Sequence, residues 1–148
     1  MSFQSTPAYA GDLHPAEAYR LLSESSSAVL IDVRTRPEWA YVGAPDLSAL
    51  DKDTVFLEWQ TYPSMQRDGA FADRLADMLA KAGVVRGSSL LFICRSGARS
   101  RDAAISMTAS GWSPCFNVAE GFEGALDPAG HRNTVGGWRV GGLPWKQT

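Results

Sequence analysis

Short apolar runs alternate along this chain of 148 residues with segments that have helical spacing. The runs at residues 29–33, 55–59, 90–93 and 115–118 are bounded by polar or turn-forming residues. The first of them is rich in β-branched side chains, which favour strands. These runs predict four short strands, of which the first is expected to be buried.

Three other segments place apolar residues on one helical face. One covers residues 15–22, one begins at Phe71 and stops before Gly83, and one covers residues 98–110 before Gly111. Glycine directly after the last periodic residue is typical of a helix end. Alternating strands and helices predict an α/β fold with a central, mostly parallel sheet and helices on both faces. Residues 1–10 are predicted to be a flexible tail, and residues 11–148 one domain.

The composition changes this picture little. Hydrophobic residues make up 45% and charged residues 20%, as in a soluble globular domain. The net charge of −2 gives no general attraction to nucleic acids or acidic membranes, and no apolar run is long enough to span a membrane. The N-terminus lacks a secretory pattern, and two cysteines are too few for a disulfide scaffold. We therefore expect a cytoplasmic protein with reduced thiols and no membrane or nucleic-acid partner.

Cys94 is the residue with the clearest chemical context. It ends the apolar run at 90–93, and the loop after it leads into the predicted helix at 98–110. Backbone N–H groups of such a loop can hold an anion. The helix dipole and the nearby guanidinium groups of Arg95, Arg99 and Arg101 favour the reactive thiolate. The sequence thus predicts a nucleophilic cysteine beside a site for a small anion.

The motif Cys94-x-x-Gly97-x-Arg99 resembles the active-site loop of the rhodanese-like sulfurtransferases. Other segments match this family in order along the chain. They are Val29-Leu30-Ile31-Asp32-Val33-Arg34, Pro37-Glu38-Trp39, Val118-Ala119-Glu120-Gly121-Phe122, Gly136-Gly137-Trp138 and Gly142-Leu143-Pro144. The resemblance covers about residues 13–145 and implies the family's three-layer fold.

The resemblance also implies a sulfurtransferase activity that needs no cofactor. Cys94 would take the outer sulfur of thiosulfate, or of a similar donor such as 3-mercaptopyruvate, as a persulfide. Cyanide, a thiol or an acceptor protein would then remove that sulfur. Cys94 and Arg99 are the implied catalytic residues, and the donor-binding residues are Arg95, Ser96, Gly97, Ala98 and Ser100. No metal is expected, because neither His14 nor His131 lies in a Cys/His cluster.

The number of residues between Cys94 and the arginine distinguishes sulfur transfer from the chemistry of cysteine phosphatases. Cysteine phosphatases need Cys-x5-Arg, which would place arginine at position 100, where the chain has Ser100. A shorter loop makes a smaller cradle, which suits a sulfur atom better than a tetrahedral phosphate. Sulfur transfer is therefore favoured over phosphatase or arsenate reductase activity. The other alternative is a sulfur carrier or protein-interaction module with little turnover.

Two stretches depart from the family pattern. Residues 42–47 lack the histidine that the family often carries there, and residues 122–135 form an additional stretch. We expect this stretch to be either a flap near Cys94 or a longer surface connection. Asp32 and Arg34 are expected to be structural, and Cys115 a core residue rather than a second reactive thiol.

Overall fold

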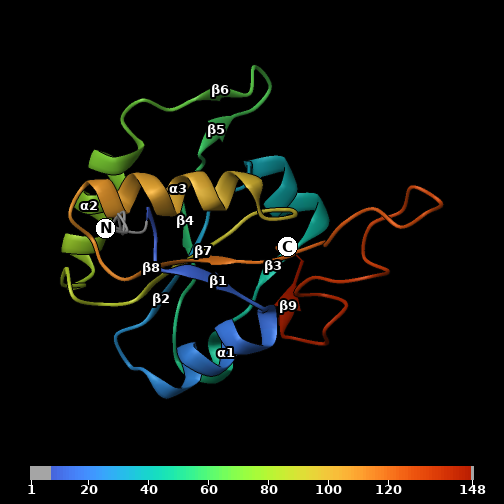
Figure 1. Ribbon diagram of the computed structural model, residues 1–148, viewed down its shortest axis with the longest axis horizontal. Coiled ribbons are helices and arrows are strands. Elements are labelled where there is room, and N and C mark those ends of the chain that lie inside the picture. The colour runs from blue at the N-terminus through green and yellow to red at the C-terminus, as the bar shows by residue number, and fades with distance from the viewer. Residues whose placement is uncertain (1–7, 148) are drawn as a thin grey trace, which may run out of the picture.

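The computed structural model describes residues 8–147 and is built around one five-stranded parallel sheet. The strand order is β1, β8, β7, β2, β4, and the strands are β1 (Gly11–Leu13), β2 (Val29–Asp32), β4 (Val55–Phe56), β7 (Leu90–Ile93) and β8 (Cys115–Val118). Helix α1 (Pro15–Glu24) covers one face, and α2 (Phe71–Lys81) and α3 (Ala98–Ala109) cover the other (Figure 1). The predicted three-layer α/β fold is confirmed.

The helix ends follow local signals in the sequence. α1 begins with Pro15 in its first turn, and the Glu17 side chain accepts a hydrogen bond from the backbone N–H of His14. Gly83 and Gly111 follow α2 and α3 with φ angles of 78° and 94°. Glycine adopts such angles at little cost, so the predicted stops lie where both helices end.

The strands differ from the sequence prediction both in length and in number. The run at 55–59 forms a strand only over β4, because the N–H of Trp59 bonds to the carbonyl of Val33 and shifts the regular pairing. The chain then leaves the sheet for a small hairpin of β5 (Gln60–Thr61) and β6 (Gln66–Arg67). β1 has no apolar run and was not predicted; it forms by parallel pairing with β8.

The central strand β7 divides the core between the two faces of the sheet. Leu90, Phe92 and Cys94 belong to the cluster that packs under α2 and α3. Leu91 and Ile93 belong to the cluster on the α1 face. Side chains alternate along a strand, and Cys94 continues this alternation one residue past the end of β7. Its side chain therefore faces α3.

After β8 the chain makes a long excursion, orange to red in Figure 1, before it returns to the body. The additional stretch at residues 122–135 begins at Phe122, which is buried in the core on the α1 face, and then continues into this excursion. The chain then ends in β9 (Trp145–Lys146), which pairs with β3 (Ala44–Pro45). Trp138 is fully buried, its indole N–H donates to the carbonyl of Pro144 at 2.7 Å, and its ring meets Tyr19 of α1 edge to face. Trp138 thereby anchors this segment to the α1 layer.

Two further expectations concern the predicted N-terminal tail and membrane-spanning segments. Residues 1–7 of the predicted tail lie outside the described residues, whereas the N–H of Ala10 donates to the carbonyl of Cys115. Within residues 8–147, no helix is both long and apolar enough to cross a membrane.

We predict that Trp138→Ala lowers the free energy of unfolding by about 3–5 kcal/mol, because it leaves a large cavity in the core. Chemical denaturation followed by circular dichroism measures this loss. Trp145→Ala is the matched control, since Trp145 is 36% exposed and should cost much less. Equal losses in the two variants would contradict the anchoring role of Trp138.

Candidate active site

The Cys94 loop lies where the chain passes from β7 to α3. Residues 94–97 connect the two elements at the carboxyl ends of the parallel strands, where open α/β sheets place their ligands. Gly97 precedes α3 with a φ angle of 115°, a conformation that glycine adopts readily. This turn brings the N–H of Gly97 back to the Cys94 side chain just after the end of β7.

The Cys94 sulfur receives two polar contacts inside this loop. The N–H of Gly97 donates to Sγ at 3.1 Å, and the hydroxyl of Ser100 lies 3.2 Å from it. Cys94 is 1% exposed and Ser100 is completely buried. A sulfur beside a helix N-terminus and an N–H donor is well placed to carry negative charge.

A backbone clamp fixes the loop from the opposite side. The N–H of Phe122 donates to the carbonyl of Cys94 at 2.8 Å, and that of Glu123 donates to the carbonyl of Arg95 at 2.9 Å. Gly121 has a φ angle of 60°, and a Cβ atom there would collide with the Cys94 carbonyl. The clamp therefore requires glycine at position 121.

Arg99 forms an ion pair with a residue far away in the sequence. Its Nη1 and Nη2 atoms bind the two carboxylate oxygens of Glu38 at 2.7 and 3.0 Å. Glu38 begins the short helical turn η1 (Glu38–Val42) and also accepts hydrogen bonds from the N–H and hydroxyl of Thr35. Arg99 thus ties the first turn of α3 to the segment after β2.

The charge on Arg99 is stabilised at this position. Burial opposes the charge, but the hydrogen bonds and the negative charge of Glu38 outweigh it. Smaller contributions come from Cys94 and Asp32, and together they raise the pKa of Arg99 above its usual value. Arg99 is a fixed cation whose charge Glu38 largely balances.

The remaining predicted loop residues differ in their exposure. Arg95, Ser96 and Ala98 are exposed, and Gly97 is half-buried. Within residues 8–147, no carboxylate forms a salt bridge with Arg95. The structure therefore brings Cys94, Gly97 and Ser100 together at the sulfur and leaves Arg95 as an accessible cation on the same loop.

Asp32 and Arg34 form a buried ion pair at the end of β2. Both side chains are fully buried, with Arg34 Nη2 2.6 Å from the Asp32 carboxylate. The same Nη2 atom donates to the carbonyl of Gly43, and the guanidinium lies 4.3 Å from the ring centre of Phe122. These contacts hold neighbouring segments together and agree with the structural role expected for the pair.

Two residues near the sulfur were not predicted. Asn117 of β8 accepts a hydrogen bond from the Ser100 hydroxyl, and its amide donates to Asp12 of β1 at 3.0 Å. Asn117 is a polar residue within an apolar strand, which is a signal that sequence reading could have used. The pairing of Asp12 with Asn117 depends on β1, which the sequence did not reveal.

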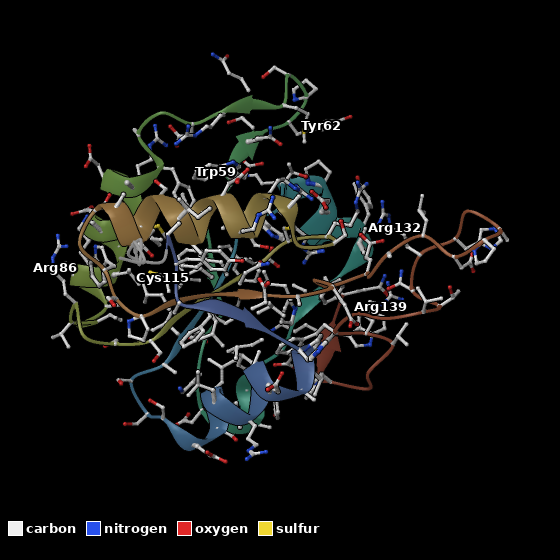
Figure 2. The ribbon with its side chains drawn as sticks, viewed as in Figure 1. Trp59, Tyr62, Arg86, Cys115, Arg132 and Arg139 are labelled. Atoms are coloured by element: carbon white, nitrogen blue, oxygen red, sulfur yellow. The ribbon has the colours of Figure 1, made fainter. Side chains whose placement is uncertain are left out.

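Cys115 lies at the opposite end of the sheet from the loop. It begins β8 opposite Leu90, and Figure 2 shows it at the far end of the sheet from Arg132 and Arg139. Burial raises the pKa of its thiol, which keeps it protonated and unreactive. Among residues 8–147, no three His, Cys, Asp or Glu side chains lie together where they could hold a metal ion.

Comparisons with known proteins agree with this geometry. A sequence profile of the rhodanese-like domain matches residues 14–127. An uncharacterized protein of Rickettsia conorii, RC0915, is 35% identical over 130 residues, which cover 88% of this chain and 92% of that protein. The uncharacterized protein RP600 of Rickettsia prowazekii is 34% identical over 130 residues, which again cover 88% of this chain and 92% of that protein.

Solved structures extend the similarity to the fold. The crystal structure of Rv0390 from Mycobacterium tuberculosis matches with a TM-score of 0.84 and 44% identity, over 95% of this chain and 99% of that one. The polysulfide-sulfur transferase of Wolinella succinogenes matches with a TM-score of 0.57 and 24% identity, over 95% and 82% of the two chains. Because the profile of the rhodanese-like domain matches most of its length, this chain belongs to the rhodanese-like domain family.

Proposed function

We propose that this protein is a sulfurtransferase that carries a sulfane sulfur as a persulfide on Cys94. The observation that carries the proposal is the buried Cys94 sulfur, which accepts a hydrogen bond from the N–H of Gly97 and lies 3.2 Å from the Ser100 hydroxyl, in a loop of the Cys-x4-Arg length. The N–H of Gly97 and the N-terminus of α3 beside the sulfur stabilise negative charge on it. Membership of the rhodanese-like family and the shared fold with a polysulfide-sulfur transferase support this chemistry.

The first half-reaction uses thiosulfate as the proposed donor. The Cys94 thiolate attacks the outer sulfur, a new S–S bond forms, and the S–S bond of thiosulfate breaks to release sulfite. The negative charge moves to the outer sulfur of the Cys94 persulfide. An acceptor such as cyanide then attacks that outer sulfur, which releases thiocyanate and restores the thiolate.

Arg95 is the proposed docking cation for the anionic donor. The charge of Arg99 is balanced by Glu38, whereas Arg95 has no such partner within the described residues and is exposed on the loop. An unpaired cation next to the nucleophile attracts a dianion and orients it by a charge-assisted hydrogen bond. Arg99 has a different role in this proposal, because it holds the loop through Glu38.

The Glu38 carboxylate is ionised at neutral pH, so both members of its ion pair with Arg99 are charged. Burial alone would raise the pKa of Glu38. The hydrogen bonds and positive charge of Arg99 and the two hydrogen bonds from Thr35 lower it by more, so the pKa of Glu38 lies below its usual value of 4.5. A lowered pKa in the folded state means that the ionised form stabilises the fold. This contribution is fully present above pH 4.5 and is lost as the pH falls through the lower folded-state value.

We predict that incubation with thiosulfate adds the mass of one sulfur to the protein, and that cyanide removes it. Intact-protein mass spectrometry measures both steps. Cys94→Ser should fold normally and gain no sulfur, because serine is not a thiolate nucleophile, whereas Cys115→Ser should still gain it. A wild-type protein that gains no sulfur from thiosulfate or 3-mercaptopyruvate would overturn the transferase proposal and favour a binding role.

For Arg95→Ala we expect the KM for thiosulfate to rise roughly threefold or more, as one contact with a charged group is lost. The kcat should change less, because Arg95 contributes to docking rather than to the cradle. Steady-state assays of thiocyanate formation at low ionic strength measure both constants. Arg20→Ala, which removes an exposed cation on α1, is the control. An unchanged KM in Arg95→Ala would refute the docking role.

Glu38→Gln should lower the free energy of unfolding at pH 7, because it removes a charge that stabilises Arg99. The difference from wild type should shrink as the pH falls below 4.5 and through the lowered pKa of Glu38 in the folded protein, where the wild-type carboxylate becomes protonated. Urea unfolding at several pH values tests this. Glu24→Gln, which removes an exposed carboxylate from α1, should show little difference at any pH; a pH-independent loss in Glu38→Gln would refute the charge argument.

A further inference from the structure

A chain of hydrogen bonds connects the Cys94 sulfur to a carboxylate at the surface. Ser100 lies within hydrogen-bonding distance of both the sulfur and the side-chain carbonyl of Asn117. The Asn117 amide in turn donates to Asp12, which is exposed on β1. Asn117 is 5% exposed, so neither of its polar groups can readily exchange its partner for water.

The chemistry of the groups fixes the direction of these bonds. The Asp12 carboxylate can only accept, so the NH₂ group of Asn117 must face it and the carbonyl of Asn117 must face Ser100. That carbonyl can also only accept, and the hydroxyl of Ser100 has a single hydrogen. When Ser100 donates this hydrogen to Asn117, it offers only lone pairs to Cys94.

We propose that Asn117, oriented by Asp12, is a positioning residue that draws the Ser100 hydroxyl hydrogen away from Cys94 and so favours the neutral thiol over the thiolate. In the thiol state the S–H group donates to Ser100, and every group in the chain has a partner. In the thiolate state the sulfur has no hydrogen to donate to Ser100, so the chain contains one hydrogen bond fewer. Either Ser100 turns to the sulfur and leaves the buried Asn117 carbonyl unpaired, or it stays and the thiolate keeps the N–H of Gly97 but receives no hydrogen bond from Ser100.

The consequence for catalysis rests on the proposed sulfur transfer. In that reaction the Cys94 thiolate attacks the donor, and the negative charge then lies on the outer sulfur of the persulfide rather than on Sγ of Cys94. A thiolate with fewer hydrogen bonds is a stronger nucleophile than a fully solvated one. Once the persulfide forms, the charge lies on the outer sulfur, and Ser100 keeps its bond to Asn117. Asn117 therefore raises the energy of the attacking state relative to the persulfide.

A substitution of Asn117 by a neutral residue removes no charged group from the neighbourhood of the loop. α3 contributes Arg99, which is paired with Glu38, and β2 contributes the buried pair of Asp32 and Arg34. Three further charges line a surface cavity of about 300 Å³ that also contains Gly97 and Asn117; they are Asp12, Arg101 and Glu120. A neutral substitution of Asn117 thus isolates the effect of the hydrogen bonds.

The test is the pH dependence of Cys94 alkylation by iodoacetamide in Asn117→Ala. Peptide mass mapping follows Cys94 separately from Cys115. We expect the midpoint of the pH profile to shift to lower pH, and alkylation below the wild-type midpoint to become about twofold to tenfold faster, as one hydrogen bond is redirected to the thiolate. An unchanged or higher midpoint would overturn the proposal. No sulfur donor is involved, so the result is independent of whether the protein transfers sulfur.

Asp12 provides a second test at an exposed position, which decides the matter if Asn117→Ala does not fold. Asp12→Ala lets the Asn117 amide turn and donate to Ser100, so it should shift the midpoint in the same direction. Asp12→Asn removes the charge but keeps an acceptor, so it should shift the midpoint less. Equal shifts in the two Asp12 variants would mean that Asp12 acts by its charge alone and would overturn its orienting role.

A double-mutant cycle completes the test. In an Asn117→Ala background, Asp12→Ala should cause no further shift, because Asp12 is proposed to act through Asn117. In a Ser100→Ala background, Asn117→Ala should cause no shift at all. Additive shifts in either background would show independent effects and would overturn the chain of bonds.

Discussion

The geometry of the site depends on the close contact between the Cys94 loop and the turn after β8. Two backbone N–H groups at Phe122 and Glu123 bond to the first two carbonyls of the loop. The contact is close enough that Gly121 cannot carry a side chain. With these carbonyls held from behind, the N–H of Gly97 in the same loop donates to the sulfur. The same clamp makes the loop rigid, so that its donors need little reorganisation when negative charge develops.

The parallel sheet brings the other parts of the site to this clamp. In a parallel sheet all carboxyl ends lie at one edge, so residues after β2, β7 and β8 become neighbours despite their distance along the chain. Glu38 reaches Arg99 across 61 positions, and Asp12 reaches Asn117 across 105. The first contact orients Arg99 of α3, and the second orients Asn117 of β8, which in turn bonds to Ser100 of α3. The nucleophile is thus positioned by four separate segments of the chain.

Charge is divided between two arginines that look alike in the sequence. Arg99 is half-buried and held in a bidentate pair, which suits the planar guanidinium and the carboxylate. Arg95 is exposed and has no carboxylate partner within residues 8–147. A buried pair costs desolvation and serves geometry, whereas an exposed cation attracts anions from solution. The sequence motif alone gives both residues the same charge and no means to separate these roles.

The sequence by itself determined the fold class, β2, β7 and β8, the positions of all three main helices, and Cys94 with its loop. These features depend on local patterns, namely apolar runs, helical spacing and glycine at helix ends, which are readable over a few residues. The tertiary structure decided the rest. β1 has no apolar run and exists only through pairing with β8, and the partners of Arg99, Ser100 and Asn117 come from distant segments. Such contacts depend on how the layers pack, and packing distances between remote segments leave no local pattern in the sequence.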